Sequence, residues 1–63
     1  MFQVWFNGKQ YLIARGGEEH AGWAILDYAA TQEDAYAKCR MDWDHFWNLC
    51  GVVPGRAINV VYS

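Results

Sequence analysis

With 63 residues and a formal net charge of −2, the chain has room for one domain and carries only five Lys and Arg, scattered along its length. A chain of this size buries only about 60% of its unfolded surface, so its core must be dense, and four Trp, four Tyr and three Phe supply that density. The weakly acidic balance argues against a nucleic-acid-binding protein, which normally shows a basic patch. The apolar runs are far too short to span a bilayer.

The start of the chain and its cysteines indicate the compartment. The chain opens at Met1 without the basic and apolar segments of a secretory signal, so we expect residues 1–63 to form the single domain of a complete cytoplasmic protein. Cys39 and Cys50 fall on one predicted helix, about 16 Å apart, whereas a disulfide needs Cα atoms within about 7 Å. Two buried free thiols are therefore predicted, which suits a reducing compartment.

A hairpin is predicted at the beginning of the chain by alternation and a turn signal. Residues 2–6 alternate with period two, and Asn7-Gly8 is the dipeptide most typical of a two-residue hairpin turn. Residues 9–14 return, with Phe6 paired to Lys9. One face of the hairpin then carries Phe2, Val4, Phe6, Tyr11 and Ile13, and the other carries Gln3, Trp5, Gln10 and Leu12.

A glycine-rich acidic loop connects the hairpin to a third strand. Gly16-Gly17 suggests a phosphate-binding loop, but the rest of that motif is missing, and Glu18 and Glu19 would repel an anion. We expect a flexible connection instead. Residues 22–29 are predicted to form the third strand, with Trp23, Ile25 and Asp27 on its solvent face and Ala24, Leu26 and Tyr28 on the other.

Residues 31–51 are the strongest helical segment. Thr31 can cap the N-terminus, Glu33 and Asp34 complement the positive end of the helix dipole, and Gly51 can end the helix in the left-handed conformation. An arc of roughly 120° collects an apolar stripe that we expect to form the core. Its members are Ala35, Tyr36, Cys39, Trp43, Phe46, Trp47 and Cys50.

The opposite face of this helix is polar and is expected to face solvent. Its spacing predicts two i,i+4 ion pairs, Asp34–Lys38 and Arg40–Asp44. Met41 is the exception, because it points almost directly away from the stripe, and an exposed Met often marks an adaptable contact. The face carries Glu33, Ala37, Arg40, Met41, Asp44 and Asn48.

A last strand completes the predicted fold. After a turn at 53–56, residues 57–62 are expected to form a strand with Ile58, Val60 and Tyr62 facing in. The order β-β-β-α-β predicts an α+β fold with two layers, an antiparallel four-stranded sheet and one long helix packed on one face.

This arrangement leaves the far face of the sheet without a predicted cover. An apolar patch of that kind is usually a binding surface, either for a second copy or for a partner. The alternative is an error of one residue in the register of the third strand, which would bury Trp23. The patch comprises Trp5, Leu12, Trp23, Ile25 and Val61, edged by Gln3, Gln10, Asp27 and Asn59.

The sequence predicts no catalytic, metal or cofactor site. A nucleophile needs a base within reach, and the hydroxyls of Ser and Thr are limited to a helix cap, Thr31, and to Ser63. An Asp42–His45 pair is geometrically possible but has no evident nucleophile. His20 and His45 do not form a zinc-binding spacing with the two cysteines.

The remaining hypothesis is a small non-enzymatic protein that binds another protein. Grouped carboxylates without a basic run beside them suit a basic partner surface, and we expect them to mask a nucleic-acid-binding surface of the target. Trp5, Trp23 and Met41 would supply apolar anchors, with Leu12 in the same sheet patch as the tryptophans. The acidic partner-binding candidates are Glu18, Glu19, Glu33, Asp34 and Asp44.

Two resemblances and one further alternative bear on the kind of partner. The profile of a short, aromatic-rich, mildly acidic chain looks like that of many phage and mobile-element proteins, including anti-CRISPR inhibitors. Ala30-Thr31-Gln32-Glu33-Asp34-Ala35, after three predicted strands, resembles the strand-to-helix junction of HicB-like antitoxin domains. Those domains also run β-β-β-α-β, and the resemblance implies neutralisation of a small toxin; their DNA-binding extension is missing here. The alternative is a single-stranded nucleic-acid binder that stacks bases on Trp5 and Trp23.

Overall fold

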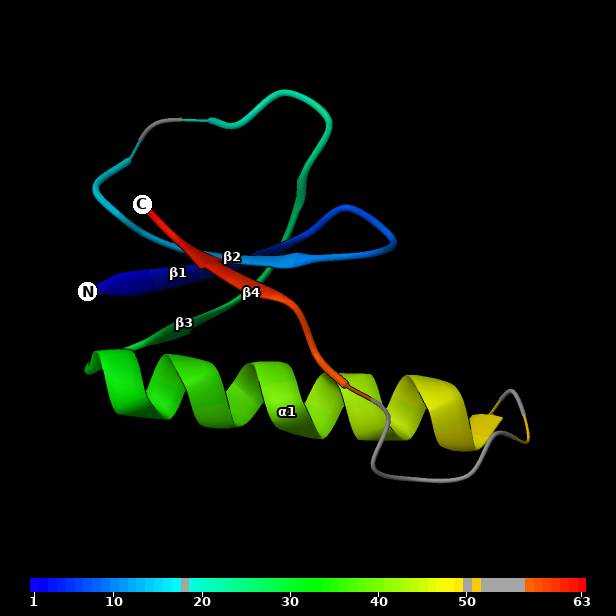
Figure 1. Cartoon of the computed structure of the whole chain (residues 1–63). Coiled ribbons are helices and arrows are strands. Elements are labelled where there is room, and N and C mark those ends of the chain that lie inside the picture. Colours follow the sequence, from blue (N-terminus) through cyan, green and yellow to red (C-terminus); the bar gives the residue numbers. More distant parts are fainter. Residues whose placement is uncertain (18, 50, 52–56) are drawn as a thin grey trace.

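The computed structural model describes residues 1–17, 19–49, 51 and 57–63. It shows a four-stranded sheet with one helix packed on one face, which confirms the α+β class (Figure 1). Sheet order is β3-β1-β2-β4. The predicted turn at 53–56 lies outside the described residues. The elements are β1 (Phe2–Phe6), β2 (Tyr11–Arg15), β3 (Ala24–Ala29), α1 (Gln32–Leu49) and β4 (Val60–Tyr62).

The hairpin forms with its turn one residue later than predicted. Phe6 pairs with Tyr11, not with Lys9, so the two central residues of the turn are Gly8 and Lys9. Gly8 has a φ of 97° and Lys9 does not have a positive φ, which matches a type II′ turn with glycine in its first central position. The Asn7 carboxamide oxygen accepts from the backbone N–H groups of Lys9 at 2.9 Å and Gln10 at 2.7 Å.

This shift changes the pairing by two residues and therefore leaves the predicted faces intact. Side chains alternate with period two along a strand, so only an odd shift would exchange the faces. The predicted inner set of the hairpin does pack toward the helix. Val4, Tyr11 and Ile13 are buried in the main core, with Phe2 and Phe6 packed against them.

In β3 the predicted face of Asp27 is wrong, because a bulge interrupts the alternation. Trp5 pairs with Ile25 but Val4 pairs with Asp27, so the register shifts between them. A bulge adds one residue on one strand and exchanges the faces beyond it. Ile25 stays on the far face as predicted, whereas Asp27 shares the helix face with Val4 and ion-pairs with Lys38 of α1 at 3.5 Å.

The last strand is shorter than predicted and runs parallel to its neighbour. Val60 pairs with Tyr11 and Tyr62 with Ile13, both in parallel register, so the sheet is mixed and mostly antiparallel. The predicted antiparallel sheet is corrected in this one strand. The reason is topological, since β1 and β2 form the centre and α1 carries the chain back before β4 is added at the edge of β2 (Figure 1).

The helix begins as predicted. The Thr31 hydroxyl accepts from the Asp34 backbone N–H at 3.1 Å, which is N-cap geometry. The helix ends at Leu49, and Gly51 follows with a φ of 74°. The predicted apolar stripe is only partly core. Ala35, Cys39 and Trp43 are buried, whereas Tyr36 and Phe46 are 38% and 39% exposed; Cys50 lies outside the described residues.

The far face of the sheet is covered only in part. The expected open patch is corrected at Trp5 and Leu12, whereas Ile25 and Val61 remain 41% and 39% exposed. The loop between β2 and β3 arches over it (Figure 1), and the His20 ring meets the Trp5 ring edge-on at 5.0 Å. Trp5 and Leu12 are each only 6% exposed, and Trp23, on this face as predicted, is half-buried against them. Burial removes Trp5 and Leu12 from any open contact surface or base-stacking platform.

Candidate functional site

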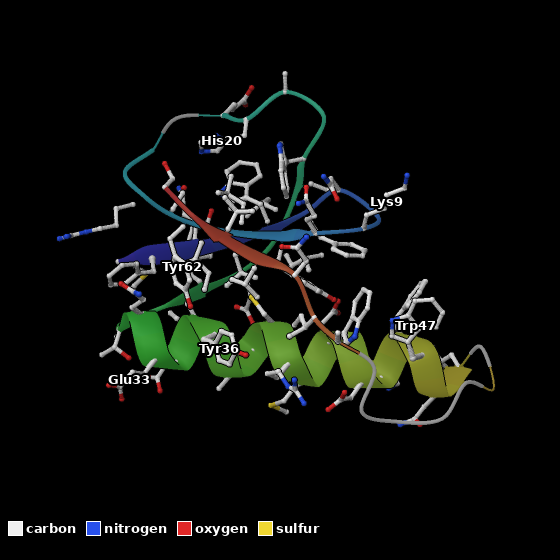
Figure 2. The ribbon with its side chains drawn as sticks, viewed as in Figure 1. Lys9, His20, Glu33, Tyr36, Trp47 and Tyr62 are labelled. Carbon is white, nitrogen blue, oxygen red and sulfur yellow. The ribbon has the colours of Figure 1, made fainter. Side chains whose placement is uncertain are left out.

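The predicted partner-binding residues fall on opposite sides of the molecule. Glu19 is exposed in the loop above the sheet, in the same loop as His20, whereas Glu33 lies on α1 below the sheet (Figure 2). A single flat contact cannot include both sides. Glu18 lies outside the described residues. The structure brings together Glu33, Asp34, Met41 and Asp44, all on α1, and separates them from Glu19 and Trp23.

The outer face of α1 is the side of the helix that points away from the sheet, and it is defined here as Glu33, Asp34, Ala37, Arg40, Met41, Asp44 and Asn48. Met41 is 72% exposed, Glu33, Asp34, Ala37 and Asn48 are exposed, and Asp44 is half-buried. The core residues of the helix lie on its opposite side at helical spacing. Packing against the sheet therefore fixes this face outward.

The carboxylates of the outer face are not neutralised within the described part of the chain. Lys38, predicted to pair with Asp34, instead contacts Asp27 at 3.5 Å and donates to the Tyr28 carbonyl oxygen at 2.6 Å. The pKa of Asp27 is lowered, first because its carboxylate accepts from the Tyr28 backbone N–H and then because Lys38 is close. Arg40 does not form the predicted pair with Asp44 among the described residues. The outer face thus presents two exposed carboxylates, Glu33 and Asp34, together with the half-buried Asp44 and Arg40, and acids outnumber bases on it.

A second feature, which the sequence did not predict, is a hollow between α1 and β4. Its volume is about 490 Å³, and Gln32, Glu33, Tyr36 and Tyr62 line it. The labelled side chains of Glu33, Tyr36 and Tyr62 lie toward the N-terminal end of α1 (Figure 2). Both tyrosines were expected in the core. They remain 38% and 50% exposed, since α1 packs against β1, β2 and β3 and leaves the β4 edge open.

The polar groups within the core have structural roles. The Tyr11 hydroxyl donates to the Asp42 carboxylate at 2.5 Å, so Asp42 is engaged by β2 and is not paired with His45, which is exposed. Burial, followed by the hydrogen bond and charge of Asp42, raises the pKa of Tyr11 above its ordinary value. Burial and Asp42 also raise the pKa of Cys39 to about 11. A fully buried, protonated thiol is a poor nucleophile.

Among the described residues, His, Cys, Asp and Glu form no group of three or more that could hold a metal ion. No helix in that part of the chain is both long and apolar enough to cross a membrane.

Comparison with known proteins adds no relative. Neither the family models, nor the curated proteins, nor the solved structures gave a match to this chain. The outer face of α1 and the hollow beside it are therefore the two candidate surfaces.

Proposed function

We propose that this chain is a non-catalytic protein-binding domain that contacts a basic surface of its partner through the outer face of α1. The observation that carries the proposal is the exposure of Glu33, Asp34 and Met41 on a helix whose other side is fixed in the core. Three carboxylates there lack an ion pair within the described residues. Such a face is complementary to Lys and Arg on a partner.

Charge and apolar contact have different parts in this contact. Complementary charges mainly raise the association rate and orient the partner, whereas a desolvated side chain near the centre supplies much of the binding energy. Met41 lies between the acidic first turn and Asp44, and its unbranched thioether adapts to an irregular surface. Ala37 and Asn48 beside it are small enough to let the partner approach the helix closely.

For the target we infer a cytoplasmic nucleic-acid-binding protein whose basic surface is masked by this helix. The formal net charge of −2 and the scattered basic residues support an acidic ligand for such a surface. The class of small phage and mobile-element inhibitors, anti-CRISPR proteins among them, acts on targets of this kind and is the class that we propose. Glu19 and Trp23 lie on the other side of the sheet and are outside the contact.

The test is affinity capture of the tagged chain from bacterial lysate at low and moderate salt, followed by titration of the captured protein. We expect a nucleic-acid-binding protein whose retention falls as salt rises. Glu33→Lys with Asp44→Lys should weaken its binding at least tenfold, and so should Met41→Asp. Glu19→Lys is the matched control, since it reverses an exposed charge on the opposite side.

Two results would contradict the proposal. One is that the variant with both Glu33→Lys and Asp44→Lys binds the captured protein as tightly as the parent chain does, provided that circular dichroism shows the variant to be folded. The other is retention of nothing but the chain itself at either salt concentration.

A further inference from the structure

Within the described residues, the outer edge of β4 has no neighbouring strand. β4 is the last strand in the sheet order. The Asn59 carbonyl oxygen accepts from the Tyr11 N–H at 2.9 Å, and the Ser63 N–H donates to the Ile13 carbonyl oxygen at 3.0 Å. Because backbone groups alternate between the two edges of a strand, those of Val60 and Tyr62 point away from β2. Within the described residues no strand pairs with them.

The hollow beside this edge has the chemistry of a cation site. Two tyrosine rings, one carboxylate and one carboxamide line it, and among the described residues no Lys or Arg joins them. The negative faces of aromatic rings attract cations, and the Glu33 carboxylate adds a full charge. A volume of about 490 Å³ is in the range that holds a small ligand or a long side chain.

The edge and the hollow share Tyr62, which joins them into one surface. A strand added beside β4 would lie about 4.8 Å from it, with alternate side chains pointing toward the helix layer. Tyr62 is on that side, because it pairs with Ile13 of the core. A helix-facing side chain of the added strand, opposite Tyr62, would therefore enter the hollow.

We propose that β4 and the hollow bind an extended basic segment of the partner protein and that an arginine side chain of this segment occupies the hollow. Arginine fits better than lysine, because its planar guanidinium stacks on aromatic rings and pairs with a carboxylate through two parallel hydrogen bonds. The backbone of the segment pairs with the free edge of β4, as in other strand-addition complexes. This inference rests on the proposed function, since it takes the partner to be the same basic protein.

The start of the helix affects this site in two opposing ways. The positive end of the α1 dipole disfavours a cation nearby. Glu33 and Asp34, both in the first turn, offset it. Glu33, which lines the hollow, is therefore expected to contribute to binding of the cation.

The test uses a blocked peptide, acetyl-Thr-Val-Arg-Val-Thr-amide, titrated into the isotope-labelled full chain and followed by NMR. We expect amide shifts confined to β4 and the first turn of α1. The citrulline analogue, which keeps the shape and loses the charge, should bind at least tenfold more weakly. Glu33→Gln and Tyr36→Leu should each weaken binding of the arginine peptide at least fivefold. Glu19→Gln is the charge-matched control and should leave this binding unchanged.

Equal binding of the arginine and citrulline peptides, or shifts that lie elsewhere, would overturn the inference. Met41→Asp separates it from the proposed function, because this change lies on the outer face of α1 and away from the hollow lining. If Met41→Asp abolishes capture of the partner while the arginine peptide fails to bind, the proposed function stands and the hollow is not its arginine site. If the peptide binds and Met41→Asp leaves capture unchanged, the hollow stands and the outer face does not.

Discussion

Tyr11 is the side chain that connects the two layers most directly. It is fully buried, its ring stacks on Phe6 at 4.5 Å between centroids and meets Trp43 edge-on at 6.0 Å. Its hydroxyl donates to Asp42 on α1 at 2.5 Å. A hydrogen bond to a charged group is stronger than a neutral one, so this contact both orients the helix and satisfies a partly buried carboxylate.

Replacing Tyr11 by Phe should lower the free energy of unfolding by about 1–3 kcal/mol, because it leaves the Asp42 carboxylate partly buried without its donor. Urea unfolding followed by circular dichroism measures the change, as a lower midpoint with an unchanged slope. Tyr36→Phe is the matched control, since this tyrosine is 38% exposed. An equal loss in both variants would show that the hydrogen bond is not the cause.

The stability of the chain should fall on the alkaline side of pH 9. The ordinary thiol pKa is 9.0, and burial raises that of Cys39 to about 11. Above pH 9 the unfolded chain therefore releases a proton that the folded chain keeps, and stability declines as pH rises toward 11. Tyr11, whose pKa is raised from 10.0, extends the decline to higher pH.

Cys39→Ala isolates the thiol contribution. Urea midpoints measured from pH 8 to pH 11 should decline less steeply in this variant than in the parent chain, whatever the stability of the variant at pH 8. Parallel pH profiles for the two proteins would rule out Cys39 as a source of the dependence.

At the level of single elements, the sequence predicted the faces of β1 and β2 and the start of α1 correctly. Alternation determines the face whichever turn register forms, provided the shift is even, and the cap of Thr31 depends only on residues three positions apart. The prediction that Asp27 faces solvent with Trp23 and Ile25 was wrong, because nothing in the local sequence pattern signals a bulge. Only the pairing of Val4 with Asp27 and of Trp5 with Ile25 reveals it.

The Thr31 cap gives an element-level prediction. Thr31→Ala removes the acceptor for the Asp34 N–H, and the free energy of unfolding should fall by about 1 kcal/mol. Thermal unfolding followed at 222 nm measures it, and Thr31→Ser, which keeps the hydroxyl, should lose far less. If serine and alanine are equally destabilising, the loss comes from the methyl group and not from the cap.

For the molecule as a whole, the fold class and the solvent-facing side of α1 were predictable, whereas the cover over Trp5 and Leu12 and the hollow beside β4 were not. Hydrophobic periodicity specifies which faces are apolar, but it does not specify the direction of β4 or the path of the loop between β2 and β3. That loop turns back over Trp5 and Leu12 and converts this part of the expected contact surface into a second small core, whereas Ile25 and Val61 stay exposed. Likewise, the acidic residues that were expected to form one binding surface lie apart in space, because Glu19 is in the loop on one side of the sheet and Glu33 is in α1 on the other.

Because the sheet has a buried core on each face, we expect tryptophans on both faces to contribute to the free energy of unfolding. Trp5→Ala and Trp43→Ala should each lower the free energy of unfolding by about 3–5 kcal/mol, a large share of the roughly 3–9 kcal/mol expected for a domain of this size. Leu49→Ala, at a position 75% exposed, is the control and should change it by less than about 0.5 kcal/mol. Chemical denaturation measures all three. A small effect at Trp5 would mean that the loop side contributes little.

The parallel pairing of β4 with β2 has a consequence for the order of folding. The hairpin joins Phe6 to Tyr11, five positions apart, whereas β4 joins Val60 to the same Tyr11 across 49 positions. The entropy lost on closing a loop grows with its length, by about 0.6 kcal/mol for each doubling, and contacts that are distant in sequence slow folding. β4 should therefore dock after the hairpin and helix have formed, and Tyr62 reaches its position beside Tyr36 only in this last step.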